Sequence, residues 1–162
     1  MGCDIWSYAE VRTGGGWRWA RNLFPDRADE NDRDEVFPDF DYRLFGFLAD
    51  VRNRSRSPVI ASARGLPGDV SLEVRTEHDA WGCDVHHASW LTLAELLGYD
   101  YDQVTRDRRV TRDGDGAALA VAGEGAHPTL RDLLGRRYFE RLAALVSLGD
   151  PADVRIVFWF DN

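Results

Sequence analysis

The stretch that decides the fold closes the chain: Val154-Arg155-Ile156-Val157-Phe158-Trp159-Phe160-Asp161-Asn162. β-Branched and aromatic residues of this kind suit a pleated, buried surface, so we expect a central strand here. A second strand is predicted at the other end of the chain, over residues 3–11, with a hairpin arm at residues 17–20. The sequence therefore predicts an α+β fold, in which a small mixed or antiparallel sheet contains both terminal strands and packs with about three helices.

Three segments between these strands have helical patterns. Apolar residues recur at helical spacing over residues 41–52. The sequence Thr92-Leu93-Ala94-Glu95 is a capping box, because its hydroxyl and carboxylate can each bind an amide at a helix start, and a helix over residues 93–98 is expected. Pro128 suits a helix start, and the apolar positions over residues 130–146 predict a long amphipathic helix.

The chain has 162 residues, of which 44% are hydrophobic, and we predict a single domain over residues 1–162. Loop excursions are expected at residues 24–40 and 105–127. Residues 26–41 contain eight acids against two arginines, which is typical of a mobile lid or of a solvated surface loop.

The formal net charge is −8, and all 20 basic residues are arginine. An acidic chain repels phosphate backbones, so a nucleic-acid partner is disfavoured. Apolar runs are too short to span a bilayer, no secretory signal follows Met1, and we expect a cytoplasmic protein without membrane contact. Two cysteines, Cys3 and Cys83, are too few for a disulfide scaffold or an all-cysteine zinc site.

Three of the four histidines fall in one stretch, at residues 78, 86 and 87. Asp84 and His86 are two residues apart, so in an extended segment their side chains point to the same side. They could share a divalent metal, or the carboxylate could orient the imidazole as a general acid or base. Alternatively, they form a structural pair that fixes the loop before the capped helix. The candidate catalytic residues are His86, Asp84 and Asp4.

Aromatic residues gather in the predicted strands and in the histidine loop. Strand alternation places Asp4, Trp6, Tyr8 and Glu10 on one face of the first strand, and the more apolar opposite face is expected to meet the core. If the first face lies beside the histidine loop, an aromatic-walled pocket forms. The alternative is a core built from large side chains. The candidate substrate-binding residues are Trp6, Tyr8, Trp81, Trp90 and Trp159.

Several blocks of the sequence recur together in one family. They are Met1-Gly2-Cys3-Asp4-Ile5, Leu44-Phe45-Gly46, Arg64-Gly65-Leu66-Pro67, Asp84-x-His86, Ser89-Trp90-Leu91-Thr92-Leu93 and the closing Val157–Asn162. On these blocks the chain resembles an uncharacterised family of small phage and bacterial proteins, over most of its length except residues 24–40 and 105–127. The resemblance implies common descent and no particular activity. The family opens with Met-Gly-Cys-Asp-Ile-His, whereas Trp6 stands at the sixth position here, so a metal site using that histidine would lack one ligand.

These observations predict a small enzyme that acts on a small organic substrate through His86 and Asp84, by hydrolysis or by a proton-transfer rearrangement. No cofactor is expected, although a divalent metal would suit the same residues. The alternative is a non-catalytic, phage-derived accessory protein that binds a protein partner or a small ligand. Both hypotheses depend on the first strand and the histidine loop bordering a shared hollow.

Overall fold

The computed structural model describes residues 2–27, 33–38, 41–105, 110–112, 118–121 and 128–161. The chain forms two compact units, one comprising residues 1–40, 63–98 and 138–162, the other residues 41–62 and 99–137. The single domain expected from the sequence stays a prediction. Within the described ranges, no helix combines the length and the apolar character needed to cross a membrane.

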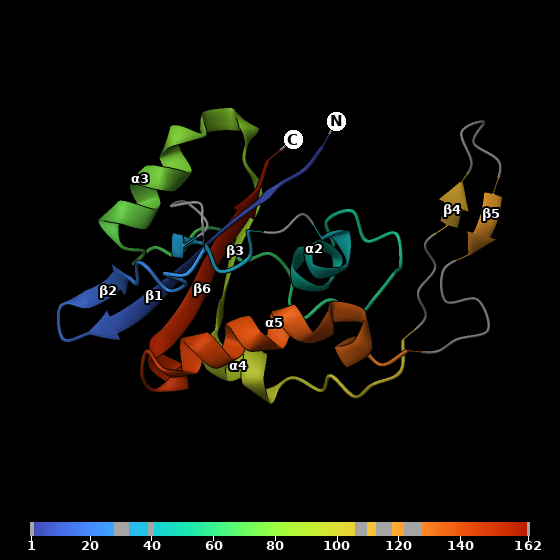
Figure 1. Ribbon diagram of the computed structural model, residues 1–162. Coiled ribbons are helices and arrows are strands. Elements are labelled where there is room, and N and C mark those ends of the chain that lie inside the picture. The colour runs from blue at the N-terminus through green and yellow to red at the C-terminus, as the bar shows by residue number, and fades with distance from the viewer. Residues whose placement is uncertain are drawn as a thin grey trace. The chain divides into compact units, whose positions relative to one another are not determined.

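The first unit contains a four-stranded antiparallel sheet with the order β2-β1-β6-β3 (Figure 1). The strands are β1 (Ile5–Thr13), β2 (Gly16–Trp19), β3 (His86–Thr92) and β6 (Val154–Phe160). Strand β6 pairs with β1 on one side and with β3 on the other, and all its residues are buried. The α+β fold, with both terminal strands in one sheet, is confirmed.

The helices are α2 (Tyr42–Ala49), α3 (Leu72–Ala80), α4 (Leu93–Gly98) and α5 (Leu130–Val146). Helix α2 ends before residue 52, because Asp50 adopts a left-handed conformation at φ 61° and its N–H donates to the Gly46 carbonyl. The capping box of α4 is formed: the Thr92 hydroxyl accepts from the Glu95 N–H, and the Glu95 carboxylate accepts from the Thr92 N–H. Helix α5 is interrupted at Gly135, at φ 74° and ψ 171°.

Helix α3 was not predicted from the sequence. Ser71 caps its N-terminus by accepting a hydrogen bond from the Val74 N–H, and Val74 is its one buried residue. A short helix with a single buried apolar residue has little of the periodicity that predicts amphipathic helices. The 3₁₀ turns η1 (Gly82–Asp84) and η2 (Pro151–Asp153) precede β3 and β6.

The second unit contains α2, several aromatic residues and an antiparallel hairpin of β4 (Val110–Arg112) and β5 (Ala118–Val121). The ring of Phe47 meets that of Tyr99 edge-on, with 5.3 Å between centroids. The hairpin falls in the expected excursion at residues 105–127, of which residues 106–109, 113–117 and 122–127 lie outside the described residues.

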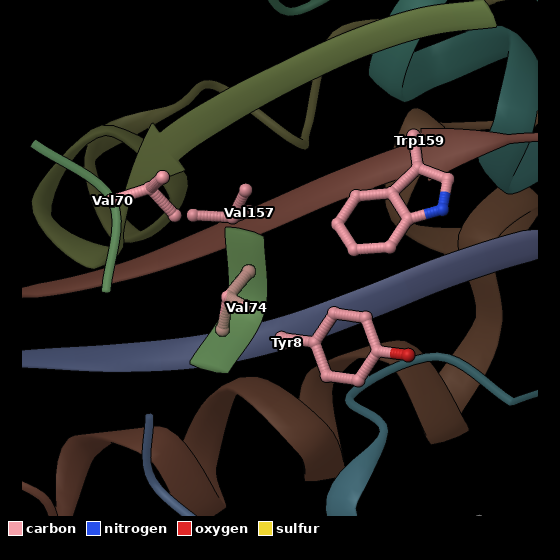
Figure 2. Close-up of a cluster of buried hydrophobic side chains, with 5 residues drawn as sticks. All are labelled: Tyr8, Val70, Val74, Val157 and Trp159. Atoms are coloured by element: carbon pink, nitrogen blue, oxygen red, sulfur yellow. The ribbon is translucent and has the colours of Figure 1, made fainter. Parts of the chain in front are cut away.

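Both faces of the sheet are covered: besides the more apolar face that was expected to meet the core, the face of β1 that carries Tyr8 and Glu10 is also buried. Strand register places Trp6 beside Trp159, and Val157 between Tyr8 and Trp90, on what we call the tryptophan face. The loop residue Val70 and Val74 of α3 pack there (Figure 2). Tyr8 is 4% exposed and Glu10 is fully buried.

The opposite face, which we call the phenylalanine face, carries Phe158 and Phe160 of β6. Helix α4 contacts β6. The Phe37 N–H donates to the Ser7 hydroxyl at 2.8 Å, and the Phe37 ring stacks on Tyr138 of α5. Phe37 belongs to the expected excursion at residues 24–40, yet it is fully buried and contributes to the core. Residues 28–32 and 39–40 of that excursion lie outside the described residues.

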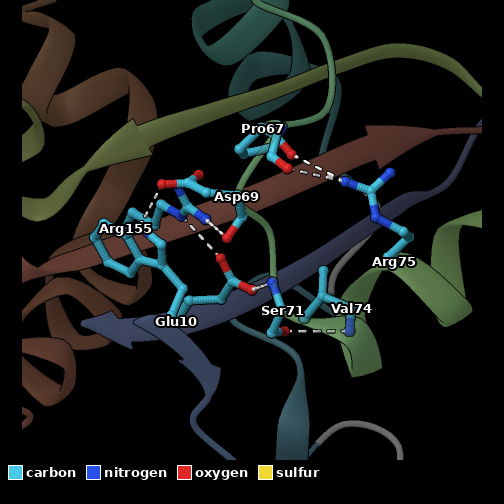
Figure 3. A network of polar contacts seen from close by, with 9 residues as sticks. Glu10, Pro67, Asp69, Ser71, Val74, Arg75 and Arg155 are labelled. Carbon is cyan, nitrogen blue, oxygen red and sulfur yellow. Dashed lines mark hydrogen bonds and ion pairs between the residues drawn. The ribbon is translucent and has the colours of Figure 1, made fainter. Parts of the chain in front are cut away.

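A buried ion pair ties the loop before α3 to the sheet (Figure 3). The Arg155 Nε donates to the Glu10 carboxylate at 2.8 Å, and the other Glu10 oxygen accepts from the Ser71 N–H at 2.7 Å. The Arg155 Nη1 donates to Asp69 at 2.8 Å, which lowers the pKa of the Asp69 carboxyl. The Arg155 guanidinium also lies 3.9 Å from the centroid of the Trp17 ring.

We expect Glu10→Gln to lower the free energy of unfolding by about 3 kcal/mol, because it leaves the Arg155 guanidinium buried beside a neutral amide. Asp153→Asn, which breaks the exposed ion pair with Arg12, is the matched control and should cost less than about 1 kcal/mol. Urea unfolding at pH 7 measures both. Equal losses in the two variants would contradict a special role for the buried pair.

The capping carboxylate of α4 should make stability depend on pH. Hydrogen bonds from Arg64, and then from Thr92, lower the pKa of Glu95 from 4.5 to about 2. A carboxyl with a lowered folded-state pKa stabilises the fold above its unfolded-state value and loses this contribution as the pH falls. We therefore expect Glu95→Gln to be less stable than the wild type at neutral pH. This difference in unfolding free energy should shrink between pH 4.5 and about 2, and thermal unfolding across that window that leaves it constant would argue against the assignment.

Candidate functional site

The predicted catalytic histidine lies on the phenylalanine face. His86 begins β3 and pairs with Phe160, on whose ring its imidazole stacks at 6.0 Å. Its Nε2 is 4.0 Å from the Cys3 Sγ, and its Nδ1 is 2.7 Å from the His87 Nδ1. His86 therefore contacts a buried thiol, a second imidazole and a core phenylalanine.

Among the described residues, no hydrogen bond or ion pair joins the three predicted catalytic residues to one another. Asp84 is exposed in the 3₁₀ turn η1, and in the described part of the chain no hydrogen bond or ion pair joins it to His86. Asp4 precedes β1, where its N–H donates to the Asp161 carboxylate and its carbonyl accepts from the Asp161 N–H. The catalytic roles of His86, Asp84 and Asp4 stay predictions.

The predicted aromatic residues do gather on the tryptophan face, where most of them pack against one another. The Trp6 and Trp81 rings are 4.5 Å apart, and the Tyr8 and Trp159 rings are 5.2 Å apart. Trp159 is fully buried, while Trp81 and Trp90 are partly buried against the same cluster. Trp6 and Tyr8 differ from these three because they also line a cleft.

This cleft has a volume of about 290 Å³ and opens beside the buried cluster of Figure 2. Strands β1 and β2 supply an aromatic floor, the segment after β2 supplies charged side chains, and α3 supplies one further carboxylate. The lining residues are Trp6, Tyr8, Trp19, Arg21, Asp34, Glu35 and Glu77.

The acidic segment is held at the cleft by backbone pairing with β1. Strand β2 pairs with β1 from Glu10 onward, and Glu35 forms an isolated antiparallel bridge with Tyr8. The Val36 N–H donates to the Ser7 carbonyl at 2.9 Å. This pairing sets Asp34 and Glu35 at the rim of the aromatic floor.

At one side of the cleft, Arg21 contacts both an aromatic ring and a carboxylate. The Arg21 guanidinium lies 3.7 Å from the centroid of the Trp19 ring, and its Nη1 is 3.6 Å from the Asp34 Oδ2. The Asn22 N–H donates to the other Asp34 oxygen. Arg21 thus combines a stacking contact with an ion pair.

Acceptor groups dominate the remaining lining. Burial, followed by the charges of Glu35, Glu77 and Asp34, raises the pKa of Tyr8, and the Arg21 charge opposes this shift. Tyr8 is therefore a neutral phenol at physiological pH. Among the described residues, neither the Tyr8 hydroxyl nor the Glu77 carboxylate has a hydrogen-bond partner. Three carboxylates and one guanidinium give the lining an excess of negative charge.

Carboxylates from two segments line the cleft, Asp34 and Glu35 after β2 and Glu77 on α3. No set of three or more His, Cys, Asp or Glu side chains in the described structure could hold a metal ion. Carboxylates beside aromatic rings suit an organic cation, whose charge is spread over several atoms.

Trp6 and Tyr8 were predicted from the sequence to line a pocket, whereas the other lining residues of this cleft were not predicted. The acid-rich run at residues 26–41 contains Asp34 and Glu35 and was the one pattern that could have indicated them. Glu77 could not be placed, because α3 was not predicted.

Comparison with family models, with curated proteins and with solved structures finds no match to this chain, so the resemblance to phage and bacterial proteins stays a prediction.

Proposed function

We propose that this protein binds a small organic cation, an ammonium or a guanidinium, in the cleft of the tryptophan face. The observation that carries the proposal is the combination of an aromatic floor with acceptors that lack partners within the described residues. Aromatic rings attract cations through the negative potential of their faces, and carboxylates add charge-assisted hydrogen bonds. This corresponds to the small-ligand form of the binding alternative that the sequence raised.

The charge of the cleft selects against other classes of ligand. Asp34, Glu35 and Glu77 would repel the phosphates of a nucleotide or nucleic acid, as would the net charge of −8. A neutral apolar ligand would leave the Glu77 carboxylate and the Tyr8 hydroxyl without partners, which costs binding free energy when water is excluded.

We also propose that the protein acts in the cytoplasm. Cys3 is buried, Cys83 is exposed, and no disulfide joins them, which fits a reducing, cytoplasmic compartment. Hydrolysis or proton transfer by His86 and an origin in phage remain hypotheses from the sequence, and binding in the cleft requires neither.

We expect Glu77→Gln to weaken binding of a cationic probe about tenfold, because it replaces a charge-assisted contact with a neutral one. The matched control is Glu73→Gln, which removes the same charge from an exposed position of α3 outside the cleft. Isothermal titration calorimetry with ethylguanidinium, ethylammonium and choline at low salt measures the affinities. Binding that is absent for all three probes, or equal in both variants, would refute the proposal.

A further inference from the structure

We infer that the ligand of this cleft is an arginine side chain presented by a partner peptide or protein, and that Arg21 holds its place in the unliganded protein. The inference rests on the proposed function and specifies the cation. It starts from Arg21, whose guanidinium already stacks on Trp19 and pairs with Asp34. Arg21 therefore already makes, with Trp19 and Asp34, the stacking contact and the ion pair that the guanidinium of a ligand would make.

The lining favours a guanidinium over other organic cations. A guanidinium is flat, so it can stack on an indole while its N–H groups donate in the plane to carboxylates. The Tyr8 hydroxyl and the Glu77 carboxylate offer acceptors for such N–H groups. A quaternary ammonium has no N–H to donate, and a lysine ammonium is a compact, strongly hydrated charge without a stacking face.

Arg21 is held loosely enough to be displaced. Its side chain is 58% exposed, and its ion pair with Asp34 spans 3.6 Å. Exposed ion pairs and exposed cation–π contacts are each weak. An incoming guanidinium would be repelled by Arg21 at close range, so the two compete for Trp19 and Asp34 rather than sharing them.

Charge complementarity points to a basic partner segment. Three acids, Asp34, Glu35 and Glu77, line the cleft against one arginine, Arg21. Carboxylates at a binding site steer cationic partners toward it and accelerate their association. An arginine within a peptide can exploit this attraction through neighbouring basic residues, which a free metabolite lacks.

The experiment titrates the full chain with Nα-acetyl-arginine N-methylamide, with the corresponding lysine derivative and with choline. We expect the arginine derivative to bind at least threefold more tightly than either other probe. Arg21→Ala should strengthen its binding about tenfold, because removal of a competing side chain increases the population of the open site. Arg18→Ala, which removes the same charge from an exposed position of β2 outside the cleft, should change the affinity less than twofold.

The outcomes separate this inference from the proposed function. If lysine or choline binds as tightly as arginine, or if Arg21→Ala leaves the affinity unchanged, the inference is overturned. The proposed function then still stands, provided that Glu77→Gln weakens binding. If no probe binds the wild type or Arg21→Ala, both proposals fail together. Circular dichroism of each variant confirms that a change in affinity does not reflect unfolding.

Discussion

The ion pair between Glu10 and Arg155 is the contact on which the tryptophan face depends. It joins the two central strands, and both residues are almost completely buried. Because Glu10 also binds the Ser71 N–H, the same carboxylate fixes the residue that caps α3. Helix α3 has one buried residue, so apolar packing alone would position it weakly. The location of Glu77 over the cleft therefore follows from a polar network in the sheet.

Some aromatic residues of the tryptophan face belong to the core and others line the cleft, depending on which residues cover them. Val70 and Val74 pack in one buried cluster with Val157 and Trp159, which are fully buried, and with Tyr8. Tyr8 at the margin of this cluster, together with Trp6 and Trp19, also borders a cleft whose other walls are charged. A continuous aromatic surface thus stabilises the fold at one end and remains available to a ligand at the other. Strand alternation fixes the face of each residue but does not determine which end is covered.

Local patterns in the sequence were sufficient for most of the fold. The capping box of Thr92 and Glu95 and the closing strand depend on neighbouring residues, and both are formed as expected. The histidine loop was harder to predict, because its geometry was assumed to be extended. Residues 82–84 form a 3₁₀ turn, and His87 has φ 51° where β3 shifts register. The rule that residues two apart share a side does not apply across such a turn. The charged lining of the cleft was not predicted, because long-range pairing brings it to Trp6 and Tyr8.

The electrostatics of the cleft explain how it can attract a cation without binding it as a metal centre does. Burial and nearby carboxylates raise the pKa of Tyr8, so the floor stays uncharged while the negative charge lies on acids around it. A small, strongly hydrated ion gains little from such a site, because within the described residues no three ligating side chains come together to hold it. A flat organic cation can lose part of its hydration to the rings and keep its N–H groups directed at the rim. Neutral floor and charged rim together select for the shape of the cation as well as for its sign.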